Sequence, residues 1–481
     1  MSLARVEPFV TSIVEPTLIF WLGGYLLIFL GTRSRLIGAP SIRSMPWTSA
    51  FGIPLGLGLF MRYAFELSAG NSLIADALSL LCAVAAVPAG FATLRAKRDD
   101  WRPALTPRLL SFPALWLPLA WLCVMYPVID GDAKEIWFFH AKMIFYGKGI
   151  NPGAGFQDAG VFFSHPDYPK MVPALAASIA NFSGSWNDYL PKYAVALVWA
   201  PLFCFLADTL AGRRWIDGLL LLVVILSGAG FLLYNGYMDG LIAGWCAGFA
   251  GATWLMSVNH EKPDAHHTGM HGVDSVTPAM FCGLALAMIL NLKFEGLPLS
   301  AILLVATVIL FRPPGFRLQP FCLAAGPGLV TFTVWRLFCS RWNLLNDMAS
   351  DPGAAWARFV RRVSERDSWQ MIDRAFSVFF APWWIWLPGG ILIALAWQRD
   401  RRDPAMCQIS STCFSALAYA GFLVLVYMTT HHDLAWHLTF SASRTLLPAQ
   451  TLILVACGFL VIRYARGYRA HAGRILRRRQ P

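Results

Sequence analysis

Charged residues are scarce in this chain of 481 amino acids. Asp, Glu, Lys and Arg make up 14% of the residues and hydrophobic residues make up 57%, whereas soluble domains have about 25% charged and roughly 45–50% apolar residues. A soluble core at this chain length has too little interior volume to bury so much apolar surface. Disorder is also excluded, because disordered chains are poor in hydrophobic residues. The composition therefore predicts an integral membrane protein.

Paired cysteines and aromatic-rich basic segments are also missing. None of the ten cysteines forms a CxxC pair, so neither a zinc site nor a disulfide framework is indicated. The net charge of +12 does not indicate a nucleic-acid partner, because no basic domain interleaved with aromatic residues is present. Much of the charge lies in a tail after the last apolar run, at Arg463, Arg466, Arg469, Arg474, Arg477, Arg478 and Arg479. Such a tail is typical of a cytoplasmic anchor against anionic lipid.

The chain does contain a series of long apolar runs. A helix that crosses about 30 Å of hydrocarbon needs about 20 residues, or fewer where the helix is short or broken. The candidate spans are 9–30, 46–65, 72–94, 109–129, 189–210, 217–234, 238–258, 277–292, 296–311, 320–338, 378–397, 406–430 and 445–463. A further apolar run at 171–182 has only about 12 residues, which is short for a span.

The positive-inside rule decides whether 171–182 crosses the membrane. The short basic connectors, of which Arg213 and Arg214 form one, share a single side only if 171–182 does not cross. We therefore predict an all-α integral membrane protein with about 13 transmembrane helices and with extracytoplasmic interfacial helices. The N-terminus is expected outside and the C-terminus inside, with 171–182 forming a re-entrant or interfacial helix.

This topology gathers the polar segments on the outer face. It places there the loops 130–188, 339–377 and 431–444 and the turns 235–239 and 291–295. Residues 356–374 alternate in charge and predict an exposed amphipathic helix, a candidate platform for an acceptor. The His-bearing inner loop 259–276 lacks the spacing of metal ligands, so we interpret it as a solvated loop.

The stretch 128–173 is the richest in reactive side chains. Asp130 and Asp132 stand where a span leaves the membrane, and Trp137, His140 and Ile144 follow at helical spacing. This spacing predicts a helix along the membrane interface, with its aromatic residues in the headgroup layer. The alternative is that the two aspartates only cap that helix. One aspartate suffices for a cap, so we favour a functional role.

Two further outer segments combine charge with apolar surroundings. The sequence His165-Pro-Asp167-Tyr168-Pro169 holds a carboxylate between two prolines, which make a segment rigid. The alternative is a rigid loop that leads into 171–182. Lys293 and Glu295 separate two apolar runs, where charges are costly unless they are paired or functional. A structural Lys–Glu pair is an equally fair interpretation, and the same holds for Asp239.

The entrance to the last span carries a third group of polar residues. His437 and Arg444 are seven residues apart, which is two turns along one helix face. Arginine presents a planar fork that suits phosphate. Snorkelling toward lipid headgroups explains Arg444 alone, but it does not explain Trp436 and His437 beside it.

Taken together, these blocks resemble a known family. The pattern Asp132-Ala, Trp137, His140-Ala-Lys142 and then His165-Pro-Asp167-Tyr168-Pro169 resembles bacterial multi-spanning GT-C glycosyltransferases of the protein-mannosyltransferase and aminoarabinose-transferase type. The blocks Lys293-Phe-Glu295-Gly296 and Asp433 to Arg444 resemble further blocks of uncharacterised members. The resemblance covers residues 120–450 approximately.

The chain departs from the family pattern in two ways. The catalytic carboxylate of these enzymes usually follows the first span, whereas here it follows the fourth. Residues 1–108 would therefore be an N-terminal three-span addition, 109–463 the catalytic module and 464–481 the basic cytoplasmic tail. Members of the family tend to have Trp directly before the catalytic Asp, whereas here Gly131 stands in that place and splits the acidic pair, which leaves either Asp130 or Asp132 as the base.

The resemblance implies transfer of a sugar from a polyprenyl-phosphate-linked donor to an acceptor hydroxyl on the outer face, with inversion. Asp132 would be the general base, and Asp130 or Asp167 would position the acceptor. The cations expected to stabilise the leaving phosphate are Lys142, Lys293, His437 and Arg444. The remaining substrate-binding candidates are His140, His165, Tyr168 and Glu295.

The resemblance also bears on cofactors, partners and location. No cofactor is required, and a divalent metal is optional because side chains can neutralise a lipid monophosphate. The acceptor would be a lipid, a glycan or a protein, and the partners include the lipid bilayer but no nucleic acid. The expected location is the bacterial inner membrane, with the N-terminus periplasmic and the C-terminus cytoplasmic.

Two functions from other classes stay open. A lipid-linked glycan transporter or flippase needs ionisable residues along a path through the membrane midplane, whereas here they cluster at one face. A non-enzymatic membrane assembly protein would explain a capping aspartate and an anchored tail without any donor.

Overall fold

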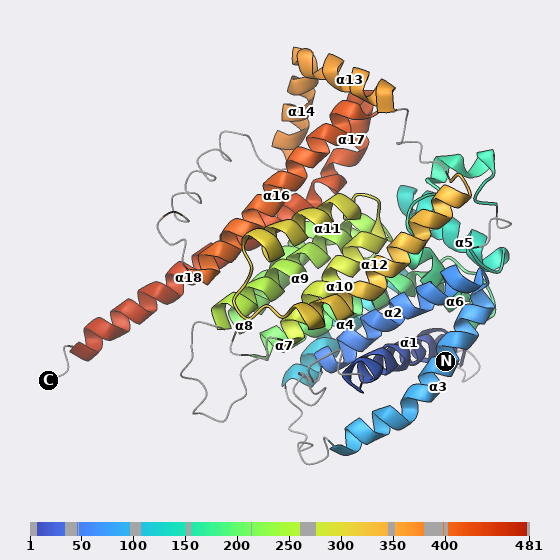
Figure 1. The fold of residues 1–481 in the computed structure, drawn as a ribbon, viewed down its shortest axis with the longest axis horizontal. Coiled ribbons are helices and arrows are strands. Elements are labelled where there is room, and N and C mark those ends of the chain that lie inside the picture. The colour runs from blue at the N-terminus through green and yellow to red at the C-terminus, as the bar shows by residue number, and fades with distance from the viewer. Residues whose placement is uncertain are drawn as a thin grey trace.

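The computed structural model describes residues 7–33, 46, 48–96, 107–150, 155–212, 214–259, 276–344, 352–379, 398 and 403–478. Within these residues the chain forms helices and no strand (Figure 1). The first half comprises α1 (Glu7–Arg33), α2 (Ser49–Ala69), α3 (Ser72–Ala96), α4 (Pro107–Met125), the π-helical turn η3 (Ala133–Trp137), α5 (Phe138–Tyr146), η5 (Ala159–Ser164), α6 (Met171–Ser183), η6 (Leu190–Lys192), α7 (Tyr193–Leu210), α8 (Trp215–Ala229) and η7 (Gly230–Leu233).

The second half continues as a helical bundle that ends in a long helix. It comprises α9 (Met238–Asn259), α10 (Val276–Leu292), α11 (Gly296–Leu304), η9 (Val305–Leu310), α12 (Leu318–Arg341), α13 (Pro352–Ser364), α14 (Arg366–Phe379), α16 (Pro404–Thr429), α17 (Leu434–Thr445) and α18 (Leu447–Arg478). The basic tail predicted at 464–481 thus continues α18 as far as Arg478.

Seven helical segments among the described residues are long and apolar enough to cross a membrane. They are Thr11–Gly31, Leu190–Leu210, Trp215–Leu233, Met238–Val258, Leu318–Arg341, Pro404–Thr429 and Leu434–Arg466. Five shorter apolar helices accompany them. The prediction of an α-helical, multi-pass membrane protein is confirmed, whereas the count of about 13 spans stays a prediction. The predicted span 378–397 and the His-bearing loop 259–276 lie mostly outside the described residues.

The core of the bundle consists of apolar helices with small residues at their contacts. Every residue of α10 is buried, as is the whole apolar stretch of α9. At the crossing of α1 and α2, a Cβ on Gly24 would lie 1.7 Å from the Pro54 carbonyl oxygen, and one on Gly58 would lie 1.7 Å from that of Phe20. Glycine is therefore required where these two backbones touch. Such close packing holds helices together where water is absent.

The short helix α6 is the segment predicted not to cross. It has 13 residues, which span about 20 Å at 1.5 Å per residue. Its residues 171–180 are all buried, and it packs against α1, α2, α5 and α7. This length is below the roughly 30 Å of a hydrocarbon core, and the prediction that the segment is re-entrant or interfacial stays a prediction.

Contacts between helix termini sort the bundle into two ends. We call one the Asp132 end; its contacts are Glu66 with Ile150, Asp132 with Arg444, Lys293 with Asp239, Asp167 with Arg336, and Lys192 with the Tyr126 carbonyl. We call the other the Arg466 end; its contacts are Ser49 with Asp208, Arg214 with the Val258 carbonyl, Arg466 with Asp217, and Arg463 with Asp403. The segments assigned to the outer face by charge thus meet at the Asp132 end.

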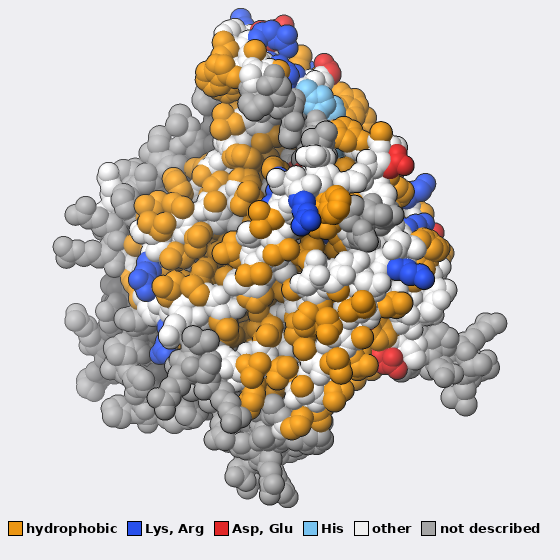
Figure 2. Space-filling model, turned by 45° about the vertical axis from the view of Figure 1, so that its right-hand side comes forward, with side chains coloured by type: hydrophobic (Ala, Val, Ile, Leu, Met, Phe, Trp, Pro, Cys, Tyr) orange, Lys and Arg blue, Asp and Glu red, His pale blue; other side chains and the backbone are white. Residues whose placement is uncertain are grey.

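Figure 2 shows a surface in which hydrophobic side chains cover most of the visible described area and charged side chains lie mainly toward its margins. An aqueous surface would be rich in charge instead. The visible face is therefore of the kind that contacts lipid.

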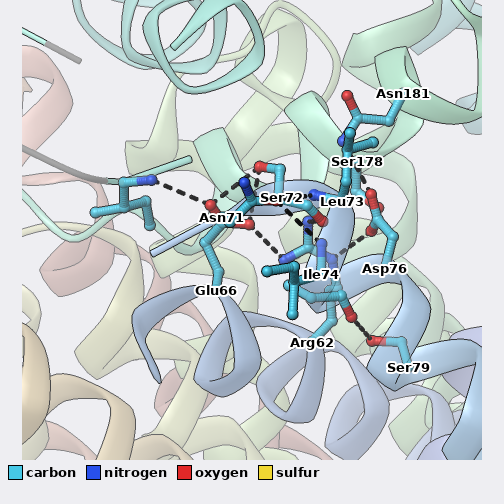
Figure 3. Close-up of polar contacts among 12 residues, drawn as sticks. Arg62, Glu66, Asn71, Ser72, Leu73, Ile74, Asp76, Ser79, Ser178 and Asn181 are labelled. Carbon is cyan, nitrogen blue, oxygen red and sulfur yellow. Dashed lines mark hydrogen bonds and ion pairs between the residues drawn. The ribbon is translucent and has the colours of Figure 1, made fainter. Parts of the chain in front are cut away.

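A buried polar network joins α2, α3 and α6 (Figure 3). Arg62 is fully buried and donates to Glu66 at 2.7 Å and to Asp76 at 2.6 Å. Asp76 also accepts from Ser178 and Asn181 of α6, and Glu66 accepts from Ser72 and from the backbone N–H of Ile150; these contacts are part of a single network. Because the buried charges are paired and hydrogen-bonded, the network fixes α6 and the 148–150 turn against α2 and α3.

Candidate functional site

Five charged side chains from four separate segments meet at the Asp132 end. Arg444 Nη1 lies 2.5 Å from Asp132 Oδ2 and 3.8 Å from Asp239 Oδ2. Lys293 Nζ lies 3.0 Å from Asp239 Oδ1 and 3.3 Å from Glu295 Oε1. We call these five residues the central cluster. It contains three carboxylates and two cations, so its formal net charge is about −1 when all five are ionised.

The central cluster has a buried side and an accessible side. The side chains of Lys293 and Asp239 are 8% and 5% exposed, whereas those of Arg444 and Asp132 are 22% and 26% exposed. Burial lowers the pKa of Lys293, but attraction to Asp239 and Glu295 outweighs burial and raises it overall. Lys293 therefore stays cationic and anchors the buried Asp239 and the half-buried Glu295, while the carboxylate of Asp132 is more exposed.

The backbone around Asp132 is built for close contacts. The Asp132 N–H donates to the Tyr237 hydroxyl, and the Arg444 guanidinium lies 4.8 Å from the Tyr237 ring centroid. A Cβ on Gly131 would lie 3.1 Å from that hydroxyl, which explains the small residue between the two aspartates. Gly236 has φ +101°, a conformation that favours glycine.

The capping interpretation fails for Asp132. Asp132 precedes the π-helical turn η3, yet its side chain accepts no capping hydrogen bond from that helix. Its carboxylate is instead bonded to Arg444. π-Helical turns are rare and are frequently found at functional sites. Asp130 lies outside the ion pairs: its Oδ1 is 3.5 Å from the Tyr126 hydroxyl, and its buried Oδ2 has no hydrogen-bond partner among the described residues.

A second group of polar residues surrounds the start of α6. Arg336 of α12 lies 3.3 Å from Asp167, whose carbonyl accepts from the Trp335 indole. The Lys170 ammonium lies 3.1 Å from His140 Nδ1, and His140 Nε2 lies 2.9 Å from the Ser164 hydroxyl. Both Lys170 and His140 are fully buried.

Burial dominates the titration of this second group. It lowers the pKa of Lys170 to about 7 and, together with the charge of Lys170, holds the pKa of His140 well below its usual range. Burial also raises the pKa of Asp167, against the opposing charges of Lys170 and Arg336. The second group adjoins the central cluster, because the Arg336 guanidinium lies 5.3 Å from the ring of Phe294, which separates Lys293 from Glu295.

Two of the remaining candidates of the 128–173 stretch, His165 and Tyr168, lie in an aromatic stack. His165 adopts φ +54° and stacks on Tyr168 at 4.8 Å, and Tyr168 stacks on Trp137 at 5.5 Å. Trp137, His140 and Ile144 are buried within the protein, so the prediction that this face lies in the headgroup layer is wrong. The helix is amphipathic because it packs on α6, and periodicity alone does not distinguish a protein contact from a lipid contact.

Lys142 and His437 lie outside the ion pairs of the central cluster. Lys142 pairs with Asp188 at 3.0 Å. Burial raises the pKa of Asp188, but hydrogen bonds from Lys142 and Trp186 outweigh burial and lower it. The His437 ring packs against Tyr427 and His432 at 5.0 and 5.5 Å, and its buried Nδ1 has no hydrogen-bond partner among the described residues.

Sequence reasoning missed three residues of this region and the network of Figure 3. Tyr237 and Arg336 touch the central cluster or its neighbour, and Lys170 carries the buried cation. Arg336 gave a usable signal, because it lies in a predicted span, where arginine is costly unless it is paired. Arg62 and Asp76, which also lie in predicted spans, gave the same signal, whereas Glu66 lies just beyond the span 46–65. Tyr237 gave none.

Among the described residues, no group of three or more His, Cys, Asp or Glu side chains is placed to hold a metal ion. Comparison with known proteins adds no identification, because the chain matches no protein-family profile, no curated protein and no solved structure. The function therefore has to be inferred from the site itself.

Proposed function

We propose that the chain is a membrane glycosyltransferase of GT-C type. It moves a sugar from a polyprenyl-phosphate-linked donor to an acceptor hydroxyl on the extracytoplasmic face and inverts the anomeric carbon. The proposal includes the full topology of about 13 spans in a bacterial inner membrane, with the N-terminus periplasmic and the C-terminus cytoplasmic. The Asp132 end is then the outer end.

One observation carries this proposal. The Asp132 carboxylate is partly exposed and is held by Arg444 at the end of a bundle of apolar helices. A lipid-linked donor keeps its tail in the bilayer and presents its phosphate and sugar at that level. A carboxylate fixed there meets the first requirement of a general base, which must come within about 2.6–3.2 Å of the acceptor hydroxyl.

In the proposed reaction, Asp132 accepts the proton of the acceptor hydroxyl. The acceptor oxygen forms a bond to the anomeric carbon, and the bond from that carbon to the phosphate oxygen breaks. The electron pair leaves with the polyprenyl phosphate, whose charge grows in the transition state. Arg444 is the partly exposed cation closest to Asp132, so it both orients the base and faces the developing charge.

The contacts of the other candidate residues support a proposed role for each. Lys293 contacts two carboxylates and is nearly buried, so it holds the cluster together rather than binding phosphate. Asp130 has an unpaired carboxylate oxygen beside Asp132, which suits it to orient the acceptor. Asp167 is committed to Arg336 and is almost fully buried, so we assign it to positioning Arg336.

A transfer assay separates this proposal from the two other classes. The purified chain is reconstituted in vesicles with a radiolabelled polyprenyl-phosphate sugar and a mixture of lipid, glycan and protein acceptors. We expect label to leave the polyprenyl carrier and to appear in an acceptor. Movement of intact donor between leaflets without transfer would indicate a flippase, and no change in the donor would indicate an assembly protein; either result refutes the proposal.

The sidedness has its own test. Lys134 lies at the Asp132 end and is exposed, whereas Tyr464 is exposed near the Arg466 end. In intact cells, a membrane-impermeant thiol reagent should label Lys134→Cys but not Tyr464→Cys. After the membrane is permeabilised, the reagent should also label Tyr464→Cys. The reverse pattern would place the Asp132 end in the cytoplasm and contradict the mechanism together with the topology.

A further inference from the structure

Helix α13 is turned the opposite way from a helix on a water-exposed surface. Trp356, Val360 and Val363 stand at i, i+4 and i+7, which places them on one face, and they are 66%, 48% and 38% exposed. We call these three residues the α13 apolar face. A surface helix of a soluble protein turns such a face toward the core and its charges toward water.

Two of the arginines of α13 point into the protein instead. Arg362 is 6% exposed and donates to the carbonyls of Tyr427, Thr430 and His432. Arg358, one turn away, donates to the carbonyl of Thr429. These carbonyls lie at or just beyond the C-terminal end of α16, where the last carbonyls of a helix lack partners within it. Cations at this end are also favoured by the helix dipole.

These contacts fix the orientation of α13. Rotating the helix to bury its apolar face would break the hydrogen bonds of both arginines and leave the α16 carbonyls unsatisfied. The neighbouring helix α14 supports the arrangement, because its Ser368 and Ile372 are buried, it packs against α17, and its Trp369 indole donates to the Val363 carbonyl. Figure 1 shows α13 and α14 at one extremity of the molecule, beside α16 and α17.

The chemistry of α13 identifies what covers its apolar face. The helix carries no acidic residue that would repel the phosphates of lipid headgroups, and its exposed Arg361 complements them. Tryptophan is enriched at the level of the headgroups. α13 also caps the terminus of α16, one of the helices long and apolar enough to cross the membrane, so it stands at the depth at which that helix leaves the hydrocarbon.

We propose that α13 lies in the headgroup layer of the membrane, with its apolar face toward the acyl chains. Arg361, whose side chain is 65% exposed, then lies on the aqueous side. Helix α13 is thus a membrane-surface element rather than part of an acceptor platform. This inference needs only α16 to cross the membrane, and it does not depend on the reaction at Asp132.

Site-specific photocrosslinking tests this inference. A benzophenone amino acid is introduced at one of three positions. Val360 tests the α13 apolar face. Glu365, which is exposed, follows α13 and lies outside that face, is the negative control, and Leu425, which is exposed within α16, is the positive control. The full chain is reconstituted in vesicles of phosphatidylcholine and phosphatidylglycerol that contain radiolabelled phosphatidylglycerol. After irradiation we expect the Val360 position to capture lipid at least about five-fold more than the Glu365 position, and about as well as Leu425.

Two outcomes would overturn the inference. They are equal capture of lipid at Val360 and Glu365, and crosslinking of Val360 to a second copy of the chain. A measurement on the unmodified chain guards against misfolding of the variants. Vesicles with a diazirine-bearing phospholipid should label Trp356 or Val363 but not Arg361 or Glu365. Peptide mass spectrometry locates the labelled residues. Labelling of Arg361 or Glu365 without Trp356 and Val363 would also overturn the inference.

Discussion

Arg444 Nη1 lies 2.5 Å from Asp132 Oδ2, although 312 residues separate the two in the chain. Arg444 comes from α17, at the entrance to the last apolar helix, and Asp132 follows α4. Their contact brings two distant blocks of the sequence into one site. It also gives Arg444 a second function, because the arginine orients the carboxylate as well as providing positive charge.

Arg444→Lys should impair transfer even though it keeps the charge. Lysine lacks the planar fork with which arginine reaches Asp132 and the Phe440 carbonyl together. We expect kcat/KM to fall by about 10- to 100-fold. Adding Arg444→Lys to Asp132→Asn should cause little further loss, because residues that act as a unit are not additive. Fully additive losses would show that Arg444 acts independently of Asp132.

Lys293→Met should lower stability rather than act on donor binding alone. The substitution leaves Asp239 and Glu295 without their shared cation in a nearly buried position. Removing one partner of a buried pair costs about 3–5 kcal/mol. Lys142→Met serves as the control, since the exposed pair with Asp188 is worth about 0–1 kcal/mol. Equal melting temperatures for the two variants in thermal unfolding would contradict the structural role of Lys293.

Arg62→Met should also destabilise the fold. Methionine is apolar and leaves two buried carboxylates, Glu66 and Asp76, without their cation. We expect a loss of about 3–5 kcal/mol and faster proteolysis in the 148–150 turn, which Glu66 anchors through Ile150. Ser68→Ala is the matched control on the exposed side of α2. A melting temperature as high as that of Ser68→Ala would mean that the network is dispensable.

Lys170 should give stability a pH dependence of known sign. Its pKa is lowered by burial to about 7, from an ordinary value of 10.5. Between these values the unfolded chain holds a proton that the folded chain has released, so the contribution of Lys170 to stability rises with pH. The melting temperature of Lys170→Met minus that of the wild type should therefore fall from about pH 7.5 to about pH 10.

The subtraction in this experiment removes the titration of groups common to both chains. The low pKa of His140 keeps its folded-state titration below this window. A difference in melting temperature that stays constant, or that grows with pH, would contradict the buried position of Lys170.

Composition and the distribution of arginines predicted the class of fold because both are properties of the whole chain. Apolar runs predict membrane helices, and the basic connectors predict which helix ends lie on the same side of the membrane. The grouping of Asp132, Lys293 and Arg444 at one end agrees with that distribution. The charge pattern predicted that the short run at 171–182 does not cross the membrane. This run lies in a helix of 13 residues that is largely buried in the protein.

Side-chain partners were not predictable because they depend on packing between distant segments. For Lys293 the sequence left open a phosphate ligand or a structural pair with Glu295; the structure pairs it with Glu295 and also with Asp239, which the sequence did not predict. Trp137 was expected in the headgroup layer, but it is buried in the protein core. Residues 356–374 were expected to form an exposed amphipathic helix, and the structure has two helices, α13 and α14, in this segment. The contacts of Arg362 with α16 show which face of α13 points away from the protein.

The most direct test of the central claim is the rate of sugar transfer by Asp132→Asn, measured with a radiolabelled polyprenyl-phosphate sugar in reconstituted vesicles. Glu365→Gln, which neutralises an exposed carboxylate just after α13, is the matched control. We predict that Asp132→Asn lowers kcat by at least about 100-fold with a melting temperature near that of the wild type, and that Glu365→Gln transfers normally. Transfer by Asp132→Asn at the wild-type rate would contradict the assignment of Asp132 as the base.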